Sequence, residues 1–202
     1  MKRLILPLLC AGALALGGTA CSSGDKQSSA ITEVAYHAAY PSFTSSSELF
    51  GKADLVIEAV ALPGSEVRNL TPNIPKGDDP RLNPAAGTGT NGTATDKPLV
   101  VTVVGVTVGK VYKGAVKAGD RVEIKQLGGL LGTTRYTSDD KQLTPGQSYL
   151  LYLTTFPDAP ASMITPLQGQ YALQPAGSPE PLGGNTLTPS VKELEGLAAA
   201  AR

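Results

Sequence analysis

The fold of this chain is decided by its strongest strand signal, the run LVVTVVGVTV at residues 99–108. Most of its side chains are β-branched, and such side chains pack well on a pleated sheet. The sequence KVYKG at residues 110–114 continues the strand to a turn, so we expect one long strand. Gly105 and Gly109 lie inside it, and glycine within a strand indicates a bulge or sharp bend, as at the corner of a barrel.

Four further segments are predicted to be strands. Residues 54–62 (DLVIEAVAL) are rich in β-branched residues and end at a Pro-Gly turn. Residues 121–125 (RVEIK) alternate strictly between charged and apolar side chains, which indicates a strand with one face in water. Residues 149–153 (YLLYL) are apolar throughout, which indicates burial on both faces, and residues 170–173 (QYAL) form the last strand. Five strands with glycine kinks predict a small closed or partly closed β-barrel.

These segments also carry a resemblance. The motifs ADLVIE at residues 53–58, VYKG at 111–114 and PGQSYLLYL at 145–153 are similar to those of bacterial secreted proteins whose domain resembles the OB-type barrel of netrin modules and tissue inhibitors of metalloproteinases. The resemblance covers roughly residues 47–156. It implies a mainly β fold, a small five-stranded OB-like barrel with a long disordered loop and a short C-terminal helix.

The segments around the strands predict two short helices. Ser45 is placed to cap the first, with Glu48 three residues later as in a capping box, and Gly51 is expected to end it. The second begins at Thr188-Pro189-Ser190, with proline in the first turn. We expect the second helix to pack on the barrel through one face rather than to bind a partner, and that face is made of Val191, Leu194, Leu197 and Ala201.

The remaining segments set the expected domain boundaries. The barrel domain is placed at residues 45–175, and residues 176–202 are a Pro/Gly linker with the C-terminal helix. Within the domain, residues 63–98 are rich in proline and glycine and predict one long loop, whose composition favours disorder. Residues 31–43 predict either a short strand or an irregular lead-in.

The first twenty residues are typical of a bacterial secretory signal peptide. Lys2 and Arg3 supply a positive start, and residues 4–16 form an apolar stretch of about thirteen residues. That stretch is too short to span a bilayer, which needs roughly 20 apolar residues. Small residues follow, GGTA at 17–20, and then Cys21.

The cysteine after Ala20 resembles the lipobox of bacterial lipoproteins. The resemblance implies cleavage between Ala20 and Cys21 and a diacylglycerol group on the Cys21 thiol; two acyl chains hold a protein stably on a membrane. The family prefers Leu three residues before the cysteine, where this chain has Gly18. The alternative is an ordinary secretory signal with Cys21 as a free thiol. Residues 21–44 are expected to form a lipid-anchored flexible tether and lead-in.

Charge and cysteine content exclude several classes of function. The chain has 17 basic and 17 acidic residues, and cleavage would remove Lys2 and Arg3, leaving a slight acidic excess. This balance indicates neither nucleic-acid binding nor a polybasic membrane patch. Cys10 would leave with the signal, so the mature chain has no internal disulfide. If Cys21 carries lipid, it cannot present its amine to a catalytic zinc as the inhibitors of this fold do.

No catalytic or metal-binding constellation stands out, and no cofactor is expected. His37 is the only histidine and precedes the barrel, which argues against a catalytic triad or a zinc site. The run GTGTNG at residues 87–92 lacks the strand and helix that a dinucleotide-binding loop requires.

Two acidic pairs and two N-glycosylation motifs are not interpreted as functional sites. Asp78-Asp79 and Asp139-Asp140 lack the spacing of a calcium loop and are interpreted as solvated turn residues. Asn69 and Asn91 begin glycosylation acceptor motifs, but the bacterial export signal argues against their use.

Three functional hypotheses follow. The first is an extracytoplasmic lipoprotein, anchored to the cell membrane, that acts as a binding or interaction module with an envelope protein as one candidate partner. The second is an envelope hydrolase with carboxylates drawn from Glu58, Asp120, Glu123 and the loops. The third is a structural accessory lipoprotein of an envelope complex. A hydrolase predicts a cleft with two converging carboxyls, whereas a binding module predicts an exposed apolar or aromatic patch. We expect no enzymatic activity.

Overall fold

The structure is a computed structural model that describes residues 31–37, 39–70, 99–139, 141–175 and 177–201. No helix within these ranges is long and apolar enough to cross a membrane. Several features predicted from sequence lie outside the described residues: the signal peptide at 1–20 with Cys10 and Ala20, Cys21 and most of its tether, Asp78-Asp79, the glycine run 87–92, Asn91 and Asp140.

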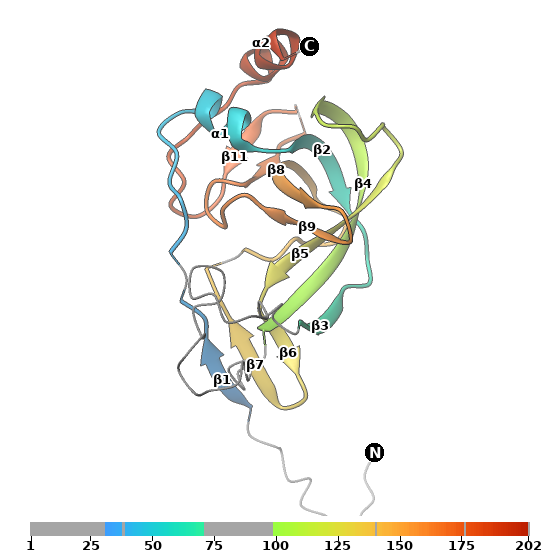
Figure 1. Cartoon of the computed structure of the whole chain (residues 1–202), viewed down its shortest axis with the longest axis vertical. Helices are drawn as coiled ribbons and strands as arrows, with labels where there is room; N and C mark the ends of the chain where they lie inside the picture. The colour runs from blue at the N-terminus through green and yellow to red at the C-terminus, as the bar shows by residue number, and fades with distance from the viewer. Residues whose placement is uncertain (1–30, 38, 71–98, 140, 176, 202) are drawn as a thin grey trace, which may run out of the picture.

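The protein is mainly β, as predicted (Figure 1). Two short helices accompany the strands. The elements in chain order are β1 (Thr32–Ala35), α1 (Ser46–Lys52), β2 (Leu55–Ala61), β3 (Glu66–Leu70), β4 (Leu99–Lys113), β5 (Arg121–Leu127), β6 (Gly129–Leu131), β7 (Thr134–Thr137), β8 (Ser148–Phe156), β9 (Ala159–Met163), β10 (Gln170–Leu173), β11 (Pro179–Pro181) and α2 (Val191–Ala200).

The larger sheet has the strand order β11-β10-β8-β2-β4-β5-β9, with β3 also paired to β4. Strand β9 pairs with β5 in parallel and with β8 in antiparallel orientation. The pairings β2–β4, β4–β5, β5–β9, β9–β8 and β8–β2 therefore follow one another in a circuit. Residues 170–173 form a strand as predicted, but this strand, β10, pairs with β8 and β11 outside the circuit. The fifth strand of the circuit is Ala159–Met163, which the sequence did not predict.

The two glycines of β4 have different roles. Glu58 pairs with Lys110 and Ala59 with Val108, so Gly109 is passed over, and the bulge predicted there is confirmed. Gly105 keeps a regular register opposite Glu123. A Cβ atom on Gly105 would lie 2.9 Å from the Arg121 guanidinium, so this glycine leaves room for the arginine side chain to cross the strand.

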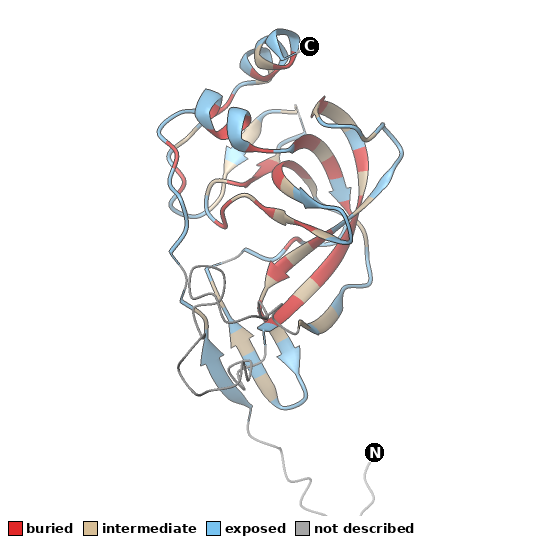
Figure 2. Cartoon of the chain, viewed as in Figure 1, coloured by how far each residue is buried: buried red, intermediate tan, exposed pale blue. Residues whose placement is uncertain are grey.

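Two apolar clusters lie on the two faces of the same strands. On β8, Leu151 and Leu153 belong to an inner cluster, and Leu150 and Tyr152 belong to an outer one. All four side chains are fully buried, so burial on both faces is confirmed for this strand. Figure 2 shows the buried residues concentrated in the strands, while much of the helical surface is exposed.

The outer cluster is covered by α1 and α2, which contribute Leu49, Phe50, Leu194 and Ala198 to it. Ser45 caps α1 by accepting a hydrogen bond from the Glu48 backbone nitrogen, but the helix continues through Gly51 to Lys52. In α2 the reciprocal capping box is Ser190 with Glu193, and Pro189 precedes the cap rather than lying in the first turn.

Residues 66–70 correct the expected loop at 63–98, because they form β3. Strand β4 is 15 residues long and continues beyond its pairing with β2, so its N-terminal part offers a free edge. Strand β3 pairs with that edge from Val103 to Leu99. Three other short strands were not predicted: β6 and β7 lie around the glycines at 128–132, and β11 lies in the Pro/Gly stretch. The lead-in forms β1, which pairs with β7 in parallel.

Candidate functional site

The predicted candidate residues do not converge. The Glu58 carboxylate accepts a hydrogen bond from the Tyr112 hydroxyl at 2.5 Å, on the outer face of β2. Asp120 accepts one from the Lys117 backbone nitrogen at 2.8 Å and stabilises the turn before β5. Glu123 lies further along β5, and His37 is exposed between β1 and α1. Within the described ranges, no three His, Cys, Asp or Glu side chains are grouped so that they could hold a metal ion.

Asp139, the described member of its acidic pair, is exposed beside a hollow of about 300 Å³. Its exposure agrees with the interpretation as a solvated residue.

The strongest candidate site is an open hollow of about 460 Å³ beside the first residues of β5, which we call the β5 hollow. Leu55 and Ala161 of the inner cluster also line it. Strand β3 supplies Arg68, and β5 supplies Arg121 and Glu123. Phe156, at the end of β8, and Asp158, in the turn before β9, complete the polar and aromatic part of the lining. Guanidinium donors, carboxylate acceptors and a phenyl ring thus share one surface.

Arg68 is held in place by two carboxylates. Its guanidinium donates to Glu66 at 2.7 Å and lies 3.7 Å from the Glu123 carboxylate. The hydrogen bond between Arg68 and Glu66 raises the pKa of Arg68 and lowers the pKa of Glu66. These pairs are solvent-exposed, and such pairs contribute little to stability. Their effect is to orient the Arg68 side chain across the hollow.

A second hollow of about 310 Å³ lies beside the first and is mostly apolar. Lys125 lines this apolar hollow, and its ammonium group lies 4.0 Å from the centroid of the Phe156 ring. Burial lowers the pKa of Lys125. Phe156 is 42% exposed and lines the β5 hollow. The contact between Lys125 and Phe156 therefore lies where the two hollows meet.

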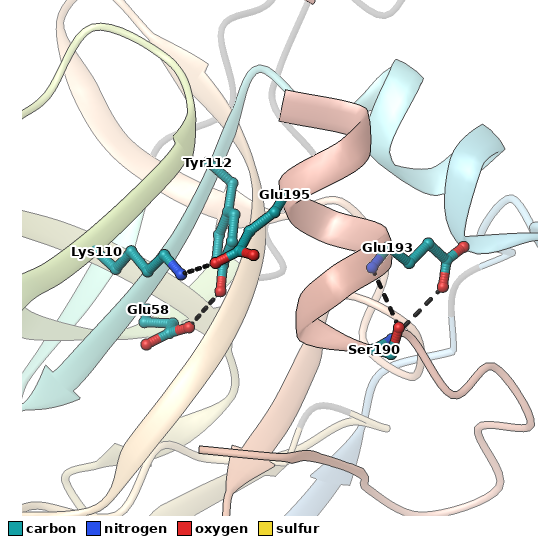
Figure 3. A network of polar contacts seen from close by, with 6 residues as sticks. All are labelled: Glu58, Lys110, Tyr112, Ser190, Glu193 and Glu195. Carbon is teal, nitrogen blue, oxygen red and sulfur yellow. Dashed lines mark hydrogen bonds and ion pairs between the residues drawn. The ribbon is translucent and has the colours of Figure 1, made fainter. Parts of the chain in front are cut away.

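A separate polar network lies on another side of the sheet, beneath α2 (Figure 3). Lys110 donates to Glu195 of α2 at 2.8 Å, and its ammonium group is 4.8 Å from the centroid of the Tyr112 ring. Burial, assisted by the hydrogen bond to Glu58, raises the pKa of Tyr112 to about 12. The hydrogen bond to Glu195 raises the pKa of Lys110. This network links α2 to β2 and β4, so we interpret it as structural.

Sequence reasoning found Glu123 and missed most of its neighbours in the β5 hollow. Arg121 shares the outward side of β5 with Glu123, and the alternation of residues 121–125 was the signal for it. Arg68, Phe156 and Asp158 come from other elements, and only the folded arrangement brings them beside β5. No protein-family model matches the chain, and neither a curated protein nor a solved structure matches it. The function is therefore argued from the site alone.

Proposed function

We propose that this chain is a lipid-anchored, extracytoplasmic binding module built on an OB-type barrel of β2, β4, β5, β8 and β9. The circuit of strand pairings, with β5 and β9 parallel, supports the barrel. OB-type barrels bind oligonucleotides and oligosaccharides on the face of their second and third strands and on the loops after strands one and four. In this order β4 and β5 are the second and third strands.

The observation that carries the proposal is the composition of the β5 hollow. Arg68 comes from the connection between β2 and β4, and Asp158 from the turn between β8 and β9, so both loops of an OB-type site contribute. The balanced charge of the chain argues against nucleic acid. A sugar ring has an apolar face and several hydroxyls, which suits the exposed Phe156 ring beside the Arg121 donors and the Glu123 acceptor. The ligand class is therefore an oligosaccharide of the cell envelope.

Binding is tested by titrating the protein with a hexamer of N-acetylglucosamine, followed by calorimetry and by NMR shifts. We expect Arg121→Ala to weaken binding by about tenfold or more, because a hydrogen bond to a charged group is lost. Arg135→Ala is the matched control, since Arg135 is an exposed arginine on β7, and it should leave the affinity unchanged. Absence of binding, or shifts away from β5, would reject the glycan proposal.

The anchor is tested separately through Cys21→Ala. The unaltered protein should partition with membranes and incorporate labelled palmitate, and the variant should do neither. A variant that still fractionates with membranes and still accepts palmitate would overturn the anchor. Mass spectrometry of the natural amino terminus checks the same point, because an unmodified terminus contradicts it.

An envelope hydrolase is the second candidate, because Glu123 and Asp158 line the same hollow. Glycosidases use two carboxyl groups placed on either side of the bond that breaks. The ion pair between Glu123 and Arg68 favours binding over catalysis. Release of shorter sugars from the same hexamer, abolished by Glu123→Gln, would favour the hydrolase instead.

A further inference from the structure

The end of the molecule farthest from α2 exposes several large apolar side chains. Ile31 is 52% exposed, Leu130 is 45% exposed and Leu131 is 37% exposed, and Val34 of β1 is 38% exposed. All four belong to β1, to β6 or to the residue just before β1. We call this set the tip. In Figure 1 the tip strands and α2 lie at the two ends of the long axis.

Strand pairing brings these residues together from distant parts of the sequence. Strand β7 is the middle strand, with β1 on one side and β6 on the other. Thr32 and Leu131 both pair with Thr134, and the Thr32 backbone nitrogen donates to the Thr133 oxygen at 3.0 Å. Ile31 therefore enters the sheet beside the turn that joins β6 to β7.

The tip is attached to the rest of the domain through Tyr36. The Tyr36 ring stacks on Tyr136 with centroids 5.5 Å apart, and its hydroxyl accepts a hydrogen bond from the Val100 backbone nitrogen at 2.9 Å. Gly129 lies against Val67 and Thr102, because a Cβ atom there would come within 2.8 Å of the Thr102 hydroxyl. The exposed side chains thus sit on an edge that is fixed to β3 and β4.

We propose that the tip docks into the interfacial layer of the phospholipid bilayer, with Ile31, Leu130 and Leu131 against the acyl boundary. The inference rests on the proposed lipid anchor at Cys21. Nine residues lie between Cys21 and Ile31, and the ten steps from one to the other, at about 3.5 Å each, span at most roughly 35 Å. The tip is also the first described part of the domain that the chain enters, so the anchor holds it close to the membrane.

The chemistry of the tip suits this occupant. Apolar side chains of interfacial proteins reach about 5–10 Å into the boundary between headgroups and acyl chains. Leu130 and Leu131 are adjacent in a strand and point to opposite faces, so they form a blunt apolar end rather than one flat face. Arg135 on β7 is 49% exposed, lies 4.0 Å from the Glu33 carboxylate of β1 and is level with Leu130, so lipid phosphates that meet it there compete with Glu33. Docking there keeps α2 farthest from the bilayer.

The test uses the full lipidated protein in vesicles of phosphatidylethanolamine and phosphatidylglycerol. Cys10 leaves with the signal and the lipid blocks Cys21, so an introduced cysteine is the only free thiol. Leu131→Cys and, as the control at the far end, Lys192→Cys each carry an environment-sensitive fluorophore. Nitroxide groups on the lipid quench fluorophores at the membrane surface. We expect at least about threefold more quenching at position 131 than at 192, because only the tip enters the interface.

A second pair of variants separates apolar contact from simple proximity. Leu130→Glu, combined with the probe at 131, should abolish most of the quenching. Leu167→Glu is the matched control, because Leu167 is 46% exposed but lies outside the tip, and it should leave the quenching unchanged. Both positions are on the surface, and thermal unfolding checks that both variants remain folded.

The possible failures are distinguishable. If Cys21 is blocked but the probe at 131 is not quenched, tip docking is wrong and the anchor stands. If that probe becomes shielded from water without quenching by lipid nitroxides, the tip contacts protein, which also overturns the inference. If the unaltered protein reacts with thiol reagents at Cys21, the anchor fails and the inference fails with it.

Discussion

The inner and outer apolar clusters are built from the same strands and are stabilised differently. The inner cluster is enclosed by strands and is mostly aliphatic, with Leu151 and Ile57 fully buried in it. The outer cluster contains Tyr112, Tyr152 and Tyr171 and is covered by the helices. Aliphatic side chains need only close packing, whereas buried hydroxyls also need hydrogen-bond partners.

The outer cluster therefore buries hydroxyl groups of which only some have a hydrogen-bond partner in the described part of the chain. The Tyr112 hydroxyl has Glu58 as its acceptor, but the Tyr152 hydroxyl is buried without a hydrogen-bond partner among the described residues. Burial raises the pKa of Tyr152 and of Tyr171, whose rings meet edge to face with centroids 5.8 Å apart. The capping box of α2 and the ion pair of Lys110 supplement the packing there.

The largest expected effect contrasts two neighbouring leucines of β8. Leu151→Ala should lower the free energy of unfolding by about 4 kcal/mol, and Leu150→Ala by about 2.5 kcal/mol. Both side chains are fully buried. The inner site is enclosed by paired strands and cannot collapse, whereas the helices over the outer site can shift to fill a cavity. Urea unfolding measures both losses, and a larger loss at Leu150 than at Leu151 would contradict the expected difference between the two clusters.

A smaller effect is expected from Tyr112→Phe. Loss of the hydrogen bond to the Glu58 carboxylate should cost about 2 kcal/mol at neutral pH. Because the pKa of Tyr112 is raised to about 12 in the folded protein, from about 10 in an unfolded chain, its contribution is complete below pH ~10. The contribution is lost as the pH rises to ~12.

The advantage of the unaltered protein over Tyr112→Phe should therefore shrink across that interval in urea titrations at several pH values. Tyr136→Phe, in the smaller sheet, is the control. A constant advantage over the whole range would contradict the assignment.

The helix cap gives the next effect. Ser190→Ala removes the oxygen that accepts from the Glu193 backbone nitrogen, which should cost about 1 kcal/mol. Ser190→Asp should restore most of the loss, since aspartate is an equally good cap. Thermal unfolding compares the variants, and equal stability of Ser190→Ala and the unaltered chain would show that the cap does not contribute to stability.

The smallest effect is expected from Lys110→Met. Lys110 and Glu195 are 41% and 58% exposed, and exposed ion pairs contribute about 0.5 kcal/mol or less. The loss should disappear in 1 M salt, because exposed charges are screened there. Methionine keeps the apolar stem, so a salt-independent loss above about 1 kcal/mol would show that the short-range contacts of the ammonium group with Glu195 and Tyr112 contribute more than a screened ion pair.

An element could be predicted from the sequence when its own residues carry the pattern, and it was missed when its structure depends on neighbouring strands. The β-branched run of β4 and the apolar run of β8 were sufficient to predict these strands. Ser-x-x-Glu predicted the start of the first helix, whereas Thr188-Pro189-Ser190 predicted the second, where the Ser190–Glu193 capping box was not noticed. Strand β9 reads APASM, with proline and small residues, and has no strand signal of its own. It is a strand because β5 and β8 each offer it a free edge, and that information is tertiary.

The candidate site divides in the same way. Alternation along β5 places Arg121 and Glu123 on one face, so these two residues of the hollow could be placed together from the sequence. Arg68 belongs to a strand predicted as loop, and Phe156 meets Lys125 only because β8 turns back along β5 through β9. The tip was missed because the glycines around Leu130 and Leu131 indicated a break in the chain.

Strand β1 is the first element of the domain to bear a force that is applied from the N-terminal side. Its four residues pair with β7 alone, and only then does the chain continue to α1 and β2. Tension entering from the N-terminal side must strip β1 from β7 before it can reach the larger sheet. If Cys21 is anchored as proposed, rupture of these few β1–β7 hydrogen bonds lengthens the free chain between the anchor and the domain and leaves the β5 hollow intact.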